Sequence, residues 1–151
     1  MAAGLSLRRE DFASFGCAFA DEVSRHLNDD DLHAVVHSDG ELAAQELSLE
    51  TAELLRASGP WGQGFPEPVF HGEFEVLSRR VVGERHLKFT VRRDSASHPL
   101  DAIAFHAVEA GVPQDCERLL LAYRLDVNEY RGVRSVQLVV EHLEALVSAR
   151  T

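Results

Sequence analysis

The sequence of 151 residues contains no run of eighteen apolar residues and only two cysteines. A membrane-spanning helix needs about 20 consecutive, mostly apolar residues, so no such helix is expected. The first residues carry neither the basic flank nor the apolar stretch of a signal peptide. Cys17 and Cys116 lie far apart and form no CxxC pair, which favours two free thiols in a reducing compartment over a disulfide. These absences predict a soluble, cytoplasmic protein without membrane contact.

The common catalytic motifs are also missing, because no HExxH, P-loop, GxGxxG or Gly-x-Ser-x-Gly pattern occurs. His33 and His37 are four residues apart and would share one face of a helix, as a metal pair requires. The segment Leu32–His37 reads as a strand instead, in which residues four apart are separated by about 13 Å, too far for one ion. The sequence therefore predicts neither catalytic residues nor a metal site.

An excess of basic residues is absent too, since 15 Lys and Arg face 25 Asp and Glu, for a net charge of -10. Spread evenly, this charge would repel phosphate groups. It is uneven: residues 1–69 hold 4 basic and 13 acidic residues, whereas residues 70–140 hold 10 of each. Residues 79–93 alone hold six basic residues and one acid. The basic residues are thus concentrated where they can form a patch.

Residues 59–70 divide the chain, because they place three prolines and three glycines around the only tryptophan. Proline lacks a backbone donor and disfavours helix in the residue before it, so no regular element runs through this segment. Its aromatic residues Trp61 and Phe65 indicate a junction packed against a domain, since flexible linkers are polar.

The part before this junction is mostly helical by its pattern. Apolar residues at spacings of three and four predict an amphipathic helix over about Arg9–Leu27. Leu32–His37 is expected to form a strand that ends in a turn at Ser38-Asp39-Gly40. A second helix is expected to begin near Ser48, whose side chain can cap it.

Five strand-like segments follow the junction. They span about Gly72–Val82, His86–Arg93, Leu100–Ala107, Leu119–Val127 and Val133–Leu143. Residues 111–116 form a loop or short helical turn between the third and fourth strands, and residues 128–132 form a hairpin loop. Five strands with their long connection after the third are typical of an OB-fold. The predicted fold class is therefore α+β, with a partial α/β segment followed by a five-stranded antiparallel Greek-key barrel.

Alternation along the strands predicts which side chains face outward. In the second strand Leu87, Phe89 and Val91 are expected inside, with Lys88 and Arg92 on the outer face. In the third strand Ile103 and Phe105 are expected inside, and Ala102, Ala104 and His106 outside.

OB-folds bind oligonucleotides or oligosaccharides on the face of strands two and three, and with the loops between strands one and two and between four and five. An aromatic ring for stacking and cations for phosphate are the requirements for single-strand binding. The predicted nucleic-acid-binding residues are Arg79, Arg80, Arg85, Lys88, Arg92, Arg124, Tyr130 and Arg131. The alternative is that these charged side chains only solvate the sheet, as on any exposed strand.

Several of these segments together resemble the C-terminal part of the RecJ family, the single-strand-specific DNA exonucleases of the DHH phosphoesterase superfamily. They are residues 59–70 (GPWGQGFPEPVF), 82–88 (VGERHLK), 100–105 (LDAIAF), 125–132 (LDVNEYRG) and 136–138 (VQL). Met1-Ala2-Ala3-Gly4-Leu5 is similar to the end of the Gly-Gly-His-x-x-Ala-Ala-Gly motif of the DHH-associated domain. The resemblance covers nearly the whole chain.

The resemblance implies the domain organisation. Residues 1–58 would be the C-terminal portion of a DHH-associated domain truncated at its N-terminus, residues 59–70 a junction, and residues 71–147 an OB-fold domain. The catalytic Asp and His residues of the family, with their Mn²⁺ or Mg²⁺, would belong to upstream domains of the same chain. No residue of this sequence matches them, so this part is expected to be inactive alone and to hold no cofactor.

The resemblance also implies the function. The parent would degrade single-stranded DNA 5′→3′ in DNA repair and recombination, and this part would bind and guide the strand without sequence preference. Two alternatives stay open. The barrel docks single-strand DNA-binding protein through its basic patch, or it only braces the catalytic domains through ion pairs with the acidic first segment.

Overall fold

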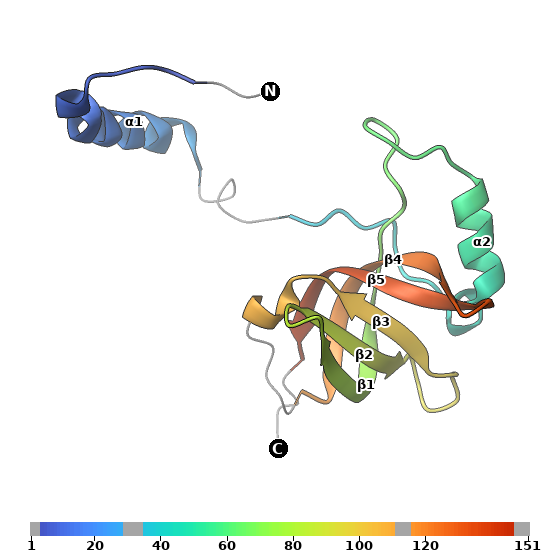
Figure 1. Cartoon of the computed structure of the whole chain (residues 1–151). Helices are drawn as coiled ribbons and strands as arrows, with labels where there is room; N and C mark the ends of the chain where they lie inside the picture. Colours follow the sequence, from blue (N-terminus) through green and yellow to red (C-terminus); the bar gives the residue numbers. More distant parts are fainter. Residues whose placement is uncertain (1–3, 29–34, 111–115, 147–151) are drawn as a thin grey trace. The chain divides into compact units, whose positions relative to one another are not determined.

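The computed structural model describes residues 4–28, 35–110 and 116–146, and divides the chain into two compact units, Met1–Val35 and Val36–Thr151. The first unit contains a short 3₁₀ helix, η1 (Arg9–Asp11), and α1 (Phe12–His26) (Figure 1). This agrees with the helix predicted from the apolar spacing. The rings of Phe15 and Phe19 stack at 5.7 Å on α1, and Phe19 is 59% exposed.

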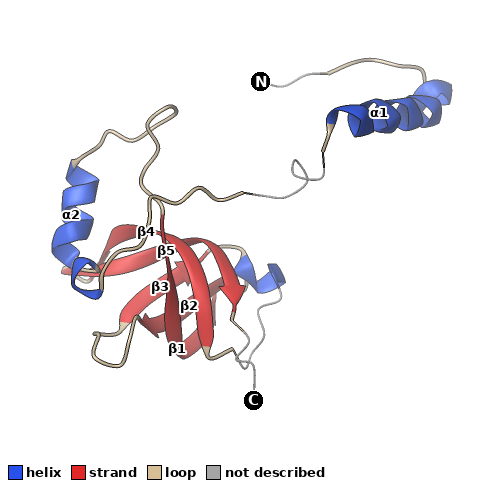
Figure 2. Ribbon diagram, turned by 180° about the vertical axis from the view of Figure 1, so that it is seen from behind, coloured by secondary structure: helices blue, strands red, loops and turns tan. Residues whose placement is uncertain are grey.

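The second unit is a closed barrel of five strands. They are β1 (Phe70–Val82), β2 (His86–Arg92), β3 (Leu100–Ala104), β4 (Arg118–Tyr130) and β5 (Val133–Ala145) (Figures 1 and 2). Their order around the barrel is β1-β2-β3-β5-β4, with every pair antiparallel except β3 and β5. The parallel pairing of β3 with β5 closes the sheet. The predicted OB-fold is confirmed.

The barrel interior alternates large and small side chains around its circumference. Ala102 of β3 lies between Phe89 of β2 and Leu138 of β5, and all three are buried. Ala104 lies likewise between Leu87 and Val140. A small barrel needs this alternation, because large side chains on all strands would exceed the interior volume.

The predicted faces of β3 are therefore wrong. Ala102 and Ala104 point into the barrel, whereas Ile103 is only half-buried and Phe105 is 53% exposed. The predicted third strand was also too long. It ends at Ala104, because His106 has the left-handed φ of 56° and the chain turns into the 3₁₀ helix η4 (Ala107–Ala110).

The second helix, α2 (Leu49–Ala57), packs on β4 and β5 within the barrel unit (Figure 2). Ser48 caps it as predicted, since the Thr51 N–H donates to Ser48 Oγ at 3.2 Å. The Trp61 indole donates to the Leu55 carbonyl at 3.2 Å and stacks on a neighbouring ring of the junction at 4.9 Å. The junction is thus folded against α2.

The segment before α2 contacts the start of β1. The expected strand Leu32–His37 is not formed over residues 35–37, and residues 32–34 lie outside the described part. The turn expected at Ser38-Asp39-Gly40 is not formed by the backbone either; the Gly40 N–H instead donates to Ser38 Oγ at 3.1 Å, and the backbone of these residues pairs with the start of β1. A second short 3₁₀ helix, η3 (Ala44–Glu46), precedes α2.

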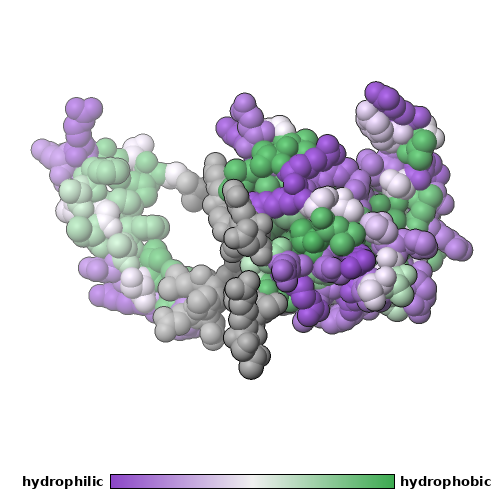
Figure 3. Space-filling view, turned by 90° about the horizontal axis from the view of Figure 1, so that it is seen from below, coloured by the Kyte–Doolittle hydropathy of each residue, from purple (hydrophilic) through white to green (hydrophobic). Residues whose placement is uncertain are grey.

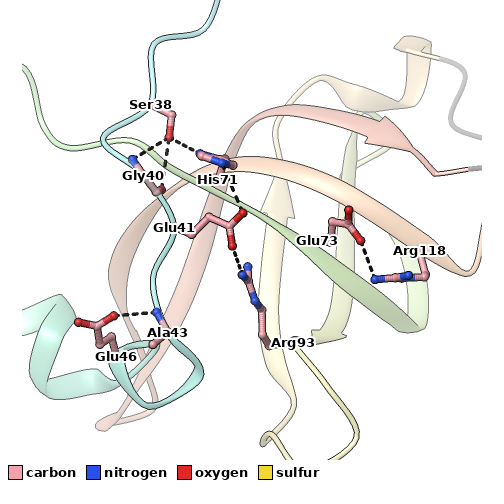
Figure 4. Close-up of polar contacts among 9 residues, drawn as sticks. All are labelled: Ser38, Gly40, Glu41, Ala43, Glu46, His71, Glu73, Arg93 and Arg118. Atoms are coloured by element: carbon pink, nitrogen blue, oxygen red, sulfur yellow. Dashed lines mark hydrogen bonds and ion pairs between the residues drawn. The ribbon is translucent and has the colours of Figure 1, made fainter.

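Side chains attach this segment to the barrel (Figure 4). Ser38 Oγ lies 2.7 Å from the ring atom Nδ1 of His71. The backbone N–H of His71 donates to the Gly40 carbonyl at 3.0 Å. Glu41 forms an ion pair with Arg93. Gly72 is buried beneath that guanidinium, where any larger residue would overlap it. Tertiary contacts therefore hold residues 38–41 without a regular strand.

Candidate nucleic-acid interface

Two turns mark opposite ends of the barrel surface on which binding was predicted. Gly83-Glu84-Arg85 connects β1 to β2 and lies beside the end of β3, because Leu87 pairs with Ala104. The β4–β5 hairpin lies toward the start of β3, because β5 runs parallel to it. Figure 1 shows the first turn near η4 and the hairpin near α2. Strands β2, β3 and β5 extend between the two turns.

The hairpin is tighter than the sequence indicated. Residues 128–130 continue β4, and only Arg131-Gly132 connect the Tyr130–Val133 pair. Both residues have positive φ, 53° and 78°, as in a type I′ turn. The Arg131 guanidinium lies over the Tyr130 ring at 5.2 Å, and this ring is 65% exposed.

Three of the predicted binding residues form ion pairs within the barrel unit. Lys88 Nζ lies 2.6 Å from Asp101 of β3. Arg92 makes a two-point contact with Glu75 at 2.6 and 2.9 Å. Carboxylates thus already neutralise these two outward cations of β2.

The third ion-paired residue is Arg124, which donates to Glu141 at 2.6 Å and to Glu67 at 2.8 Å. The hydrogen bond to Glu67 is the main cause that raises the Arg124 pKa. The hydrogen bond from Arg92 likewise lowers the pKa of Glu75. Both shifts favour the charged forms of Glu75 and Arg124.

Of the remaining predicted cations, Arg85 and Arg131 are in the two turns, and Arg79 and Arg80 are on β1. Arg80 and Arg85 are exposed and form no ion pair with another described residue. Arg80 is the cross-strand neighbour of Lys88 on the outer face, whereas Arg79 is opposite Phe89 and half-buried toward the barrel interior. The eight predicted residues therefore do not form one continuous patch.

The prediction missed three rings at the end of β3. The Phe105 and His86 ring centroids are 5.2 Å apart, and those of His86 and His106 are 5.0 Å apart. Next to these rings is a pocket of about 160 Å³ lined by Glu84, Arg85, His106 and Val108. Alternation along β3 would have predicted a solvent-exposed Phe105 only if the inward face of this strand had been known.

A second, larger pocket of about 290 Å³ lies on the outer face of β3, β4 and β5. Its lining combines apolar and charged side chains: Glu67, Ile103, Phe105, Arg124, Asp126, Gln137 and Val139. Phe105 lines this pocket and is also one of the three clustered rings. Figure 3 shows that hydrophobic residues are exposed among hydrophilic ones on one face of the molecule.

The structure shows no metal site in its described part. No three His, Cys, Asp or Glu side chains come together there to hold an ion, and His33 of the sequence pair lies outside the described residues. We therefore derive no catalytic step from these residues. None of the described helices has the length and apolar character that crossing a membrane requires.

Comparison with known proteins identifies the barrel. Residues 38–142 match the family model "RecJ OB domain". The chain is 54% identical over 144 residues to "Single-stranded-DNA-specific exonuclease RecJ" of Dickeya dadantii (strain 3937), covering 95% of this chain and 25% of the relative. The protein of the same name from Escherichia coli (strain K12) is 46% identical over 144 residues, again covering 95% and 25%. The chain thus spans about a quarter of the length of the curated relatives it matches.

A solved structure agrees with the fold. The crystal structure of RecJ in complex with Mn²⁺ from Thermus thermophilus superimposes with a TM-score of 0.69 at 21% identity, over 96% of this chain and 21% of that one. The closed barrel order and the family match over residues 38–142 lead to one conclusion. The chain belongs to the RecJ OB domain family.

Proposed function

We propose that this chain binds and guides single-stranded DNA as the OB-fold part of a RecJ-type exonuclease. The observation that carries the proposal is the match of residues 38–142 to the RecJ OB domain, over a barrel with the corresponding fold. The parent protein would hydrolyse single-stranded DNA 5′→3′ in repair and recombination. Its upstream catalytic domains would use Mn²⁺ or Mg²⁺, and this chain would supply binding only.

The mechanism proposed for this chain is electrostatic capture combined with stacking. Exposed Arg85 and Arg131 would neutralise phosphates and release counterions, and Tyr130 would stack a base. Neither interaction depends on base identity, which suits an enzyme that moves along a strand. Lys88 contributes less than Arg131, because a phosphate must first displace Asp101 from it.

The test is fluorescence anisotropy of the 151-residue chain with a labelled oligo-dT, titrated at several salt concentrations and repeated with the matching duplex. We expect preference for the single strand and an affinity that falls as salt rises. Lys88→Ala and Arg131→Ala should weaken binding and flatten the salt dependence, with the larger effect for Arg131. Arg56→Ala is the matched control, since Arg56 is an exposed cation on α2. Absence of binding at low salt would refute the proposal.

A bracing role is the second candidate, and a specific set of contacts favours it. Acidic residues that precede β1 form ion pairs with cations of the barrel: Glu41 with Arg93, Glu53 with Arg134, and Glu67 with Arg124. These pairs attach the preceding segment to the barrel. A purely structural barrel would show little DNA affinity even at low salt. Docking of single-strand DNA-binding protein through the basic patch is a separate alternative, and competition between its acidic tail peptide and DNA would reveal it.

A further inference from the structure

We propose that the pocket beside the β1–β2 turn and the adjacent Phe105 together form a subsite for one nucleotide. Arg85 and the pair His86/His106 would hold a phosphate group, and Phe105 would stack the neighbouring base. The inference rests on the proposed function, because it names where the strand is bound. It differs from the sequence prediction, which placed Phe105 in the core and the stacking ring at Tyr130.

The backbone around the pocket is held in an uncommon conformation. Glu84 and His106 both have left-handed φ values, 65° and 56°, and both line the pocket. At Glu84 this conformation belongs to the tight β1–β2 turn, whereas at His106 it marks the end of β3 and is unfavourable for a residue other than glycine. The Val108 N–H donates to the Arg85 carbonyl at 3.3 Å, which joins η4 to the turn. The two walls of the pocket are therefore fixed relative to each other.

The histidine pair supplies a hydrogen-bond donor without needing a positive charge. The backbone N–H of His106 donates to His86 Nδ1 at 3.0 Å. Because Nδ1 accepts this bond, the proton of the neutral imidazole lies on Nε2. His86 Cδ2, the ring atom next to Nε2, faces the β1–β2 turn that carries Arg85. A Cβ atom added to Gly83 of this turn would lie only 3.6 Å from it. No other described residue bonds to His86 Nε2. It is a donor available to an anion beside Arg85.

Phe105 is placed to stack a base next to that anion. Its ring is 53% exposed and packs edge-on against His86, with ring planes at 73°. It also lines the larger pocket, where Ile103 and Val139 provide apolar contact for a base extending past the ring. A base on Phe105 and a phosphate at Arg85 are thus neighbours along one strand.

The charges set the direction in which the phosphate lies. Asp126 lies near the start of β3, because it pairs with Gln137 and Gln137 pairs with Asp101. Phe105 follows the end of β3, so the two residues lie at opposite ends of this strand. Phosphate is therefore repelled from the Asp126 end of the larger pocket and attracted toward Arg85. The acid that lines the smaller pocket is Glu84, and Arg85 and His106 line the pocket with it.

The experiment compares two kinds of oligonucleotide. Affinity is measured by anisotropy with oligo-dT and with an oligomer of equal length built only from abasic deoxyribose phosphates. The variants are Phe105→Leu, Phe105→Trp and Arg85→Gln. Phe65→Leu is the matched control for the ring, because Phe65 is 59% exposed and also packs against one aromatic ring. Arg56→Gln is the matched control for the charge.

We expect Phe105→Leu to weaken oligo-dT binding about fivefold, the lower end of base stacking on an aromatic ring, without changing the salt slope. Abasic binding should be unchanged, and Phe105→Trp should retain the affinity. Arg85→Gln should weaken both oligomers and reduce the slope of log K against log salt by about 0.7. Thermal unfolding midpoints of all variants verify folding.

Two results overturn the inference while leaving the proposed function intact. One is oligo-dT binding by Phe105→Leu equal to that of Phe65→Leu. The other is an Arg85→Gln salt slope equal to that of Arg56→Gln. If the unsubstituted chain fails to bind oligo-dT at low salt, the proposed function and this inference are both refuted.

Discussion

The inward face of β3 can be tested by comparing two substitutions with opposite expectations. Ala102 is fully buried between Phe89 and Leu138, whereas Phe105 is 53% exposed. Ala102→Leu adds three carbon atoms to a filled row of the barrel. We expect it to lower the free energy of unfolding by about 1–3 kcal/mol or more, as overpacking does. Phe105→Ala should cost only about 1 kcal/mol, because half of the ring already contacts water.

The assay is guanidinium unfolding followed by the fluorescence of Trp61, which belongs to the barrel unit. Ala57→Leu is the control, because it adds the same atoms at an exposed position of α2 and should change stability by less than about 0.5 kcal/mol. If β3 faced the other way, Phe105→Ala would cost about 3–5 kcal/mol and Ala102→Leu almost nothing. That reversed order would refute the inward orientation of Ala102 described here.

Three further predictions concern single contacts. Ser48→Ala removes the cap of α2 and should cost about 1 kcal/mol in denaturant unfolding, whereas Ser58→Ala, which removes no N-cap, should cost less. Burial raises the pKa of Tyr123 to about 12, so stability should fall as pH rises from about 10 through 12, and Tyr123→Phe should abolish that part of the pH dependence. The Tyr123 hydroxyl is buried without a hydrogen-bond partner among the described residues, so Tyr123→Phe should also leave stability at about pH 7 unchanged or raised. Glu75→Gln removes the carboxylate that pairs with Arg92, so it should strengthen oligo-dT binding and steepen the salt dependence of that binding. Binding equal to that of the unsubstituted chain would show that Arg92 does not contact the DNA.

Local signals predicted the elements that depend on local interactions. The hydroxyl of Ser48 satisfies a backbone donor three residues ahead, so the start of α2 is determined by neighbouring residues alone. The period-two pattern of β2 located it within one residue, His86–Arg92 against the predicted His86–Arg93. The number of strands and the position of their long connection then determined the OB-fold.

The face of β3 depends on other strands, and the sequence therefore predicted it wrongly. Alternation shows that Ala102 and Ala104 share one face and Ile103 and Phe105 the other. Hydrophobicity alone assigns the larger pair to the core. The closed barrel reverses this choice, because Phe89 and Leu138 already fill the space on either side of Ala102. Volume around the circumference, rather than side-chain polarity, decides which face is inside.

The distribution of ion pairs follows from the same geometry and limits where a phosphate can bind. A side chain within a sheet has a cross-strand neighbour, and Lys88 finds Asp101 and Arg92 finds Glu75 in this way, 13 and 17 residues away in the sequence. A residue in a turn lacks such neighbours. Arg85 and Arg131 are in turns, and neither forms an ion pair with another described residue. Since the two turns lie at opposite ends of β3, the available positive charge is divided between the ends of one surface. A DNA strand bound at both turns would cross the ion-paired residues Lys88 and Arg92 between them. Substitutions in the turns should therefore reduce DNA affinity more than substitutions on β2.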